Sequence, residues 1–298
     1  HWRADDEGRI TARIRFAADR LRRNEAEAMA GYLGELVQAL PRSLDRRLVQ
    51  WLAHRRERWP DAPAHLDTFT DVATAFRLHP AMAFEDAAGR RQTHGEIDAL
   101  VRRRAAWLAS YGDTERERPV AIVAGTGTQV VVTVLAALRI GMPFALLDPR
   151  WPAYRIDETL ARLDPACVLA DEPIREGWTG LDAPLAAVTD ESVGLASSLH
   201  DAAAAYFACT SGTTGTPRIV VATRHALAAQ LQWLGGVLSA NAADRVLQRT
   251  PPAFDAALWE MLLPATAGMT SVFADPADLT PDRLAITSSN RGISMLQA

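Results

Sequence analysis

Hydrophobic and polar positions near the start of the chain predict a short block of regular structure. Residues 9–16 alternate apolar and polar side chains, which is typical of a strand with one buried face. Residues 24–40 repeat apolar side chains at helical spacing, and Pro41 ends the predicted helix. One strand and one helix bury too little surface to form a core. This block therefore has to pack on something else or belong to the end of a larger domain.

From about residue 67, apolar segments of strand length alternate with amphipathic segments of helix length. The predicted strands are 81–86, 119–125, 142–148, 165–171, 202–210, 218–222, 245–250 and 270–276. The predicted helices are 67–79, 93–112, 128–141, 152–164, 224–238 and 256–268, and residues 174–200 are predicted to be mostly loop. This alternation requires crossover connections and a largely parallel sheet covered on both faces. The predicted fold class is α/β, with layered αβ subdomains and mainly parallel sheets.

Composition and charge narrow the classes of function. The chain has 298 residues, of which 48% are hydrophobic and 23% charged, an ordinary globular balance. A net charge of -4 gives no support to binding of nucleic acids or of an acidic membrane surface. The first residues lack the apolar core of a signal peptide, and the longest uncharged apolar run, 130–138, is too short to span a bilayer. We expect a cytoplasmic protein without nucleic-acid or membrane partners.

The basic residues and the cysteines restrict the chemistry further. All 32 basic residues are arginine, so no reaction step that needs a lysine can occur within this chain. Cys167 and Cys209 each lie in an apolar, strand-like run, which favours reduced thiols over a disulfide framework. The seven histidines are scattered and lack the paired spacing of a metal site.

A run of Thr, Ser and Gly between two apolar strands, "TSGTTGTPR" at 210–218, is the first candidate site. A phosphate site needs glycines that let backbone N–H groups converge, and it gains from hydroxyl donors and a cation. The stretch supplies all three, through Thr210, Ser211, Gly212, Thr213, Thr214, Gly215 and Arg218. The P-loop pattern of nucleotide hydrolases does not match, because lysine is missing and the glycines are too close. Taken alone, these residues leave open a polar turn between two strands.

Two further clusters have structural readings that compete with functional ones. The segment 138–156 contains "DPRWP", a rigid turn after a buried strand, and we interpret it as structural support. In "PPAFDAALWEMLLP", 251–264, Asp255 stands at a helix start. There it can cap the helix, or it can line a pocket and bind an ammonium group. On the same helix, Trp259 and Glu260 are expected to be packing and surface residues.

Arginines on two other predicted helices are interpreted as solvated. The run "RRRAAWL" at 102–108 is expected to form the exposed face of its helix, and Arg224 and His225 are expected to be surface residues. Neither a Ser–His–Asp nor a Cys–His arrangement can be argued from the spacing.

In this order and separation, the three clusters resemble the adenylation domain of nonribosomal peptide synthetases, which belongs to the superfamily of acyl-CoA ligases and luciferases. "TSGTTGTPR" is similar to the phosphate-binding signature of that superfamily, and "GMPFALLDPRWPAYRI" to the structural motif ahead of it. "FDAALWE" resembles the segment that forms the first wall of the amino-acid pocket. The resemblance covers about residues 67–298 and implies the N-terminal subdomain of an adenylation domain, incomplete at its C-terminus.

The first block has a resemblance of its own. Residues 9–40 look like the last strand and helix of a condensation domain, although the double-histidine motif of that domain is not in this sequence. The implied organisation is a condensation-like end at 1–42, an interdomain linker at 43–66, and the N-terminal portion of an adenylation domain at 67–298.

The resemblance also implies roles for individual residues. Thr210, Ser211, Gly212, Thr213, Thr214, Gly215 and Arg218 would hold the ATP phosphates. Asp255 would pair with the α-ammonium group of the substrate, and Phe254, Ala256 and Trp259 would line its side-chain pocket. The implied reaction is attack of an amino-acid carboxylate on the α-phosphate of ATP, which gives aminoacyl-AMP and pyrophosphate. Mg²⁺ would neutralise the phosphates.

Partners follow from the same resemblance. The aminoacyl group would pass to the phosphopantetheine arm of a peptidyl carrier domain, in an assembly line that also holds a condensation domain. A small MbtH-like activator protein is a further expected partner. The residues that bind the metal and the identity of the amino acid do not follow from this sequence.

Departures from the family pattern keep two alternatives open. Arg218 stands where lysine is usual, Ile219 where glycine is usual, Arg224 where histidine is common, and Ala257 where serine is usual. These departures allow a degenerate, non-catalytic scaffold. An acyl- or aryl-acid ligase is the other alternative, but such an enzyme has no need of an acid at Asp255.

The family's catalytic lysine lies in a mobile C-terminal subdomain that this sequence does not include. We therefore predict that the purified 298-residue chain does not catalyse amino-acid-dependent ATP–pyrophosphate exchange above background. The measurement is exchange of labelled pyrophosphate into ATP with a mixture of amino acids. Robust exchange by this chain alone would refute the expectation.

Overall fold

The computed structural model describes residues 2–4, 10–12, 79–111, 118–173, 175–183, 203–210 and 218–297. It divides into two compact units, His1–Ala64 and His65–Ala298. In the first unit, β1 (Trp2–Ala4) pairs antiparallel with β2 (Ile10–Ala12), and β2 lies within the strand predicted at 9–16. The helix predicted at 24–40 and almost all of the one at 67–79 lie outside the described residues. The predicted domain boundaries stay predictions.

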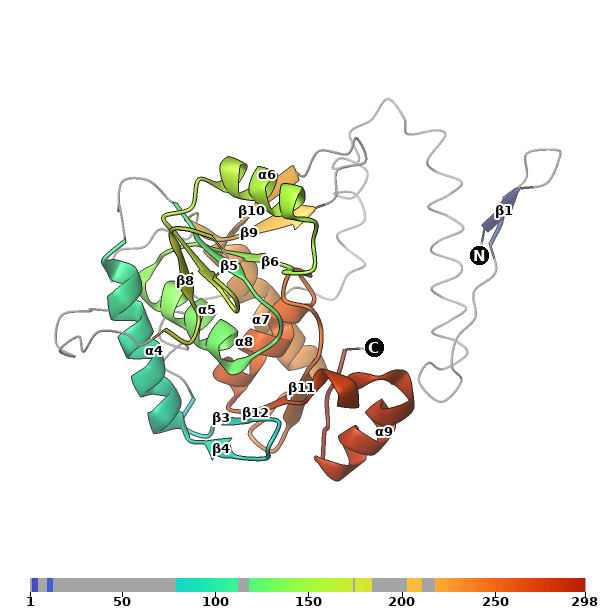
Figure 1. Cartoon of the computed structure of the whole chain (residues 1–298). Helices are drawn as coiled ribbons and strands as arrows, with labels where there is room; N and C mark the ends of the chain where they lie inside the picture. Colours follow the sequence, from blue (N-terminus) through green and yellow to red (C-terminus); the bar gives the residue numbers. More distant parts are fainter. Residues whose placement is uncertain are drawn as a thin grey trace. The chain divides into compact units, whose positions relative to one another are not determined.

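A six-stranded sheet forms the larger part of the second unit, in the order β10-β9-β6-β5-β7-β8 (Figure 1). Its strands are β5 (Val120–Val123), β6 (Phe144–Leu147), β7 (Cys167–Ala170), β8 (Trp178–Gly180), β9 (Ala204–Thr210) and β10 (Arg218–Thr223). Neighbouring strands run parallel, except that β10 is antiparallel to β9. The α/β class with a mainly parallel sheet is confirmed.

A smaller sheet of four strands has the order β11-β12-β3-β4. Its strands are β3 (Ala83–Glu85), β4 (Arg91–Gln92), β11 (Arg245–Gln248) and β12 (Thr270–Phe273). The pairs β11–β12 and β12–β3 are parallel, whereas β3 and β4 form an antiparallel hairpin. This sheet joins strands from both ends of the second unit's sequence.

Helices lie between the two sheets and on the outer face of the larger one (Figure 1). The helices described in this unit are α4 (His94–Ala109), α5 (Thr128–Ile140), α6 (Ala153–Leu163), α7 (Arg224–Leu238), α8 (Ala257–Ala267) and α9 (Pro281–Asn290), with a 3₁₀ turn, η3 (Pro276–Leu279); α9 lies to the side of the smaller sheet. Between the sheets, α5 is buried from Val130 to Leu138, so its sequence is apolar on all sides. Gly141, at φ 82°, ends it in the left-handed conformation that glycine tolerates best.

The strand β5 shows why the large sheet needs cover on both faces. Its alternate residues Val120 and Ile122 belong to the main core, with α4, α5 and α8. Ala121 and Val123 point to the other face and belong to a smaller core under α6, with Ile156 and Leu163. All four β5 side chains are buried, which is the continuous apolar run expected of a central parallel strand.

The "DPRWP" turn after β6 has the structural role that was predicted. The Asp148 carboxylate is 5% exposed and accepts hydrogen bonds from the backbone N and from Nε and Nη2 of Arg150, at 2.9, 2.9 and 2.7 Å. The Arg155 guanidinium lies 4.0 Å from the ring centroid of Trp151. These contacts fold the chain from the strand into α6.

Two of the arginines expected on the surface are buried, so this part of the prediction is wrong. Arg104 is 2% exposed and donates to the carbonyl oxygen of Leu181 and, at 3.4 Å, to Oε1 of Gln129. It lies on the buried face of α4, one turn beyond Val101 and one turn before Leu108. Arg224 is fully buried and donates from Nε to the carbonyl oxygen of Ala204, whereas His225 is exposed as expected.

Other elements were missing from the sequence prediction. The strand β8 falls inside 174–200, which was predicted to be mostly loop, and it is too short to give an alternating pattern. No helix was predicted at α9, and its weakly apolar sequence explains why. None of the helices in the described ranges is both long and apolar enough to cross a membrane.

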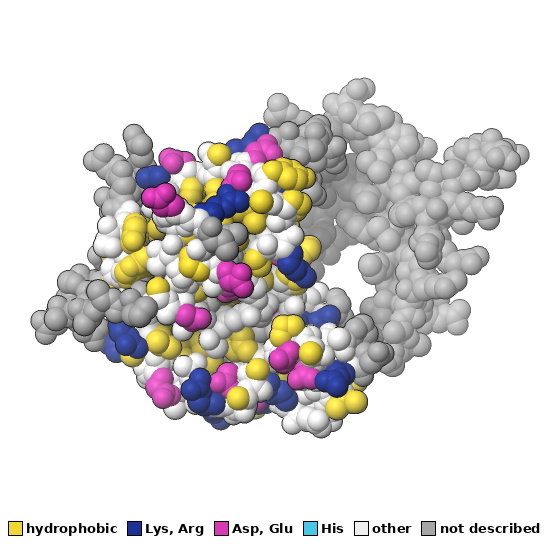
Figure 2. Space-filling view, viewed as in Figure 1, with side chains coloured by type: hydrophobic (Ala, Val, Ile, Leu, Met, Phe, Trp, Pro, Cys, Tyr) yellow, Lys and Arg dark blue, Asp and Glu magenta, His cyan; other side chains and the backbone are white. Residues whose placement is uncertain are grey.

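Surface charge and the two thiols agree with the composition. Figure 2 shows acidic and basic side chains interspersed over the described part of one face. Cys167 and Cys209 are free thiols and partly buried. Burial raises the pKa of Cys167 to about 12 and that of Cys209 to about 11, so both stay protonated at neutral pH.

A cluster of one carboxylate and two guanidinium groups links three strands of the smaller sheet. Glu85, at the end of β3, accepts from Arg245 Nη2 at 2.6 Å and from Arg291 Nε and Nη2 at 3.1 and 2.9 Å. Arg291 also donates to the carbonyl oxygen of Phe273 at 2.8 Å. The cluster therefore ties β3, β11 and β12 to the segment after α9. Burial raises the pKa of Glu85, but hydrogen bonds and charge from Arg245 and Arg291 outweigh burial and hold the pKa below its ordinary value of 4.5.

This lowered pKa predicts a loss of stability in acid. The contribution of Glu85 is complete above its unfolded-state pKa and is lost as the pH falls through the lower folded-state value. We expect Glu85→Gln to reduce the free energy of unfolding at pH 7 by about 2 kcal/mol, since it weakens partly buried charged hydrogen bonds. The variant should also lose less stability than the parent between pH 5 and pH 3. Urea unfolding at several pH values measures both, and parallel pH profiles for the two proteins would argue against this role.

Candidate active site

The predicted phosphate-binding stretch joins β9 to β10, and the structure describes its two ends. Thr210 is the last residue of β9 and pairs with Arg218, the first residue of β10. Arg218 is exposed. The residues between them, Ser211, Gly212, Thr213, Thr214 and Gly215 among them, lie outside the described residues. Because β9 runs parallel to β6, the stretch begins at the carboxyl end of a parallel strand, where α/β proteins commonly bind ligands.

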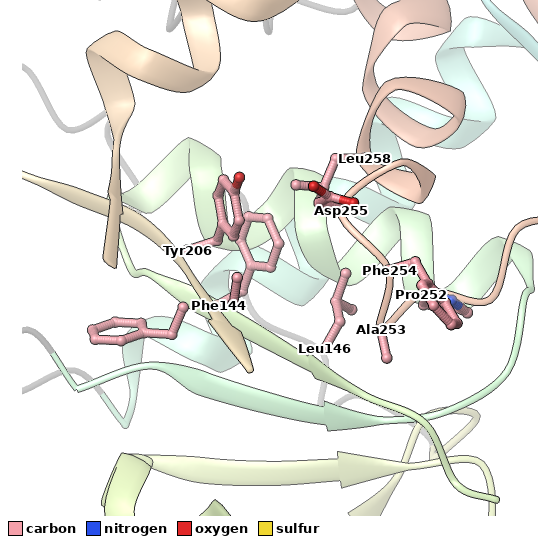
Figure 3. Close-up of a pocket in the computed structure, with 10 residues that line it drawn as sticks. Phe144, Leu146, Tyr206, Pro252, Ala253, Phe254, Asp255 and Leu258 are labelled. Carbon is pink, nitrogen blue, oxygen red and sulfur yellow. The ribbon is translucent and has the colours of Figure 1, made fainter. Parts of the chain in front are cut away.

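A pocket lies beside the strand that leads into this stretch (Figure 3). It is lined by Phe144 and Leu146 of β6, by residues 206–208 of β9, by residues 252–255 of the connection between β11 and α8, and by Leu258 of α8. The pocket thus lies between two strands of the larger sheet and the segment that follows β11 of the smaller sheet. Its lining is mostly apolar, and Tyr206 and Asp255 supply the polar groups. From Ala208 to Thr210 the strand advances by only about 7 Å.

Asp255 faces this pocket and does not cap α8. The helix begins at Ala257, with Ala256 in the cap position and no side chain bonded to the free N–H groups of the first turn. The Asp255 Oδ1 accepts from the adjacent backbone N of Ala256 at 2.8 Å, and the residue is exposed. The capping alternative therefore has no support in the hydrogen bonding, whereas a pocket-facing carboxylate is what an ammonium ligand requires.

Tyr206 is the residue beside Asp255 that the sequence reasoning missed. Its ring stacks on Phe144 at 5.7 Å between centroids and an interplanar angle of 22°. Figure 3 shows the Tyr206 hydroxyl turned toward the same end of the pocket as the Asp255 carboxylate. Burial and the charge of Asp255 both raise the pKa of Tyr206, so the phenol is neutral at pH 7 and able to donate a hydrogen bond.

The other residues predicted for the pocket lie in different settings. Phe254 lines it and is 58% exposed. Ala256 and Trp259 are not among the lining residues of this pocket. Trp259 is partly buried and donates from Nε1 to Oε1 of Gln297 at 2.9 Å. The roles of Ala256 and Trp259 in binding stay predictions.

Glu260 lies on α8 and is almost fully buried, so of the packing and surface roles expected for Trp259 and Glu260 it has a packing role. It is 1% exposed, and its carboxylate accepts from the backbone N of Arg249 and of Thr250, both at 3.0 Å, and from Thr250 Oγ1 at 2.6 Å. Burial raises the pKa of Glu260, against the lowering effect of its hydrogen bonds to Thr250 and Arg249. The signal in the sequence was a single acid inside the apolar run "LWEMLLP".

In the part of the chain that the structure describes, no three His, Cys, Asp or Glu side chains lie close enough together to hold a metal ion.

The model for the family described as AMP-binding enzyme matches residues 69–297.

The chain belongs to the AMP-binding enzyme family.

This member of the AMP-binding enzyme family is similar in sequence to parts of much longer synthases. It is 28% identical over 228 residues to tyrocidine synthase 3 of Brevibacillus parabrevis. This match covers 70% of this chain and 4% of the synthase. It is 26% identical over 299 residues to surfactin synthase subunit 2 of Bacillus subtilis, with 88% of this chain and 8% of that subunit covered. The chain therefore spans a small part of each relative.

A solved structure shares the fold. The N-terminal subdomain of NpsA from Klebsiella oxytoca, in complex with 3-hydroxyanthranilyl-AMSN, superposes with a TM-score of 0.62 at 21% identity. The match covers 76% of this chain and 57% of that one. The likeness confirms the expected fold, that of an adenylate-forming N-terminal subdomain.

The arrangement of Tyr206 and Asp255 predicts a titration that does not depend on any substrate. Asp255→Asn removes one of the two causes that raise the pKa of Tyr206, so this pKa should fall while staying above 10, because burial remains. Phenolate absorbance near 295 nm measures it, with Tyr206→Phe identifying the signal and circular dichroism excluding unfolding. Glu176→Gln, a change at an exposed acid, should leave the titration unaltered. An unchanged Tyr206 pKa in Asp255→Asn would show that the two groups do not interact.

Proposed function

We propose that this chain is part of a nonribosomal peptide synthetase module that activates an α-amino acid with ATP and loads it as a thioester on a carrier protein. The observation that carries the proposal is the Asp255 carboxylate, which faces an apolar pocket and leaves the helix beside it uncapped. The synthetase relatives support the class of reaction.

The charge of Asp255 favours a substrate that bears an ammonium group. A carboxylate at the mouth of an apolar pocket attracts a cation more strongly than it would in water, since the lining lowers the local dielectric constant. The substrate side chain would lie against the apolar residues of β6 and β9, such as Phe144 and Leu146. An organic acid without an amino group would leave Asp255 without a cationic partner, so Asp255 would not strengthen the binding of that acid.

The phosphate-binding stretch would place ATP beside this ammonium site. Thr210 follows the pocket residue Ala208 by two positions along β9, so the predicted phosphate-binding stretch starts two residues beyond the pocket lining. Backbone N–H groups and threonine hydroxyls there would hold the phosphates, and Arg218 would add positive charge. Its guanidinium is a planar fork, so it would contact two phosphate oxygens where lysine offers a point charge.

In the proposed reaction, a carboxylate oxygen of the amino acid attacks the α-phosphorus of ATP. The bond between that phosphorus and the oxygen bridging to the β-phosphate breaks, and pyrophosphate leaves with the electron pair. The product is aminoacyl-AMP, from which a carrier-protein thiol takes the aminoacyl group and releases AMP. Mg²⁺, bound with ATP, would neutralise the phosphate charge as it develops. This chain would contribute substrate binding and orientation.

The test compares an amino acid with its deaminated counterpart in the complete protein that contains this chain. Asp255→Ala should lower the ratio of kcat/KM for the amino acid over its deaminated acid on the order of 10- to 100-fold, the value of a hydrogen bond to a charged group. ATP–pyrophosphate exchange measures it, with L-leucine, L-phenylalanine and L-alanine paired with 4-methylpentanoate, 3-phenylpropanoate and propanoate.

Glu176→Ala provides the control, since it removes an exposed acid remote from the pocket lining in sequence. An unchanged ratio in Asp255→Ala would remove the role proposed for Asp255. Equal activity of the parent protein on both kinds of acid would indicate an acyl- or aryl-acid ligase, and absence of ATP-dependent activity with every acid would indicate a non-catalytic scaffold.

A further inference from the structure

The connection that carries Asp255 is closed into a ring by a side chain of the helix that follows it. β11 ends at Gln248, α8 begins at Ala257, and Asp255 lies between them. Glu260, in the first turn of α8, reaches back and accepts three hydrogen bonds from Arg249 and Thr250 at the start of the connection. In addition, Gln248 Nε2 donates to the backbone carbonyl oxygen of Glu260. Both ends of the connection are thereby held on one helix.

Within this ring the connection is a series of tight turns. The backbone N of Phe254 donates to the carbonyl oxygen of Pro251, and that of Ala257 donates to the carbonyl oxygen of Phe254, both at 3.0 Å. Pro251 and Pro252 fix their own φ angles, which leaves few conformations open between the two ends. The direction of Asp255 therefore depends on where Thr250 is held relative to α8.

A further hydrogen bond links the connection between β11 and α8 to the larger sheet. Thr126, in the segment between β5 and α5, donates from Oγ1 to the carbonyl oxygen of Thr250 at 3.3 Å. The pocket takes one wall from β6 and β9 and the other from the β11–α8 connection and α8, so its width depends on this link between the β5–α5 segment and the connection. Thr250 takes part in both sets of contacts, since it donates to the Glu260 carboxylate and its carbonyl oxygen accepts from Thr126.

We propose that Glu260 is a positioning residue for the pocket: its buried carboxylate holds Arg249 and Thr250 so that Asp255 faces the β6 and β9 side chains. Glu260 acts through the backbone and touches no pocket space itself, because it is 1% exposed and is absent from the lining. The inference rests on the proposed function for its consequence in substrate choice, but the mechanical link is a property of the chain itself.

The first readout needs no substrate. Glu260→Gln keeps the size of the side chain but removes its charge and replaces one accepting oxygen by an NH2 donor, so the hydrogen bonds donated by Arg249 and Thr250 are weakened. Amide hydrogen exchange of 249–258 in the 298-residue chain should become at least about tenfold faster. The Thr250 pair refines this: Thr250→Val removes one donor and should loosen the same segment, whereas Thr250→Ser keeps the hydroxyl and should restore slow exchange. Glu176→Gln is the matched surface control and should change nothing.

The second readout is the preference for an amino acid over its deaminated counterpart in the complete protein. Glu260→Gln should lower the ratio of kcat/KM for L-leucine over 4-methylpentanoate about tenfold toward that of Asp255→Asn, with the kcat/KM for 4-methylpentanoate kept within about twofold. A merely structural role would instead lower both values together and leave the ratio unchanged.

The outcomes separate this inference from the proposed function. Exchange in 249–258 that stays as in the parent, or a ratio that stays unchanged while Asp255→Asn alters it, overturns the positioning role. If the parent protein itself shows no preference for the amino acid, the proposed function fails, and hydrogen exchange alone decides whether Glu260 holds the segment. If Glu260→Gln does not fold, the Thr250→Val and Thr250→Ser comparison decides the same question.

Discussion

Burial of both faces of a parallel sheet is the constraint on which the rest of this structure depends. The central strand β5 sends Val120 and Ile122 to one core and Ala121 and Val123 to another, so neither face can be left to water. Helices must therefore lie on both sides, and right-handed crossovers bring them there. The "DPRWP" turn and the all-apolar helix α5 are consequences of this requirement, since one directs α6 to the outer face and the other fills the space inside.

A second consequence is the position of the candidate site. Strands β6 and β9 of the larger sheet face the connection between β11 and α8, and apolar side chains from these strands, the connection and α8 line the pocket. Asp255 is exposed there, while Glu260, only five positions along the chain, is buried and accepts three hydrogen bonds. Two acids on one short segment thus have opposite environments. Exposure leaves Asp255 open to a ligand, and burial makes Glu260 a part of the framework.

Arginine replaces lysine throughout this chain, and the structure uses arginine in ways that lysine does not allow. Arg291 contacts one carboxylate with two nitrogens while also donating to a backbone carbonyl oxygen, and Arg150 makes a paired contact with Asp148. Arg104 and Arg224 place guanidinium groups in the interior and donate to main-chain carbonyl oxygens. In the stretch predicted to bind phosphate, Arg218 stands where the resemblance leads one to expect lysine.

The sequence by itself determined the class of the fold and most strands and helices from β3 to β12, because periods of two and 3.6 residues are local properties. It also determined Asp255 as a candidate, since an acid in "FDAALWE" is visible without coordinates. Tertiary structure alone decided that Asp255 faces a pocket, that Tyr206 lies beside it, and that Arg104, Arg224 and Glu260 are buried. These facts depend on contacts between segments up to about a hundred residues apart. The identity of a charged residue does not show whether its side chain is exposed to water or hydrogen-bonded to donors from other parts of the fold.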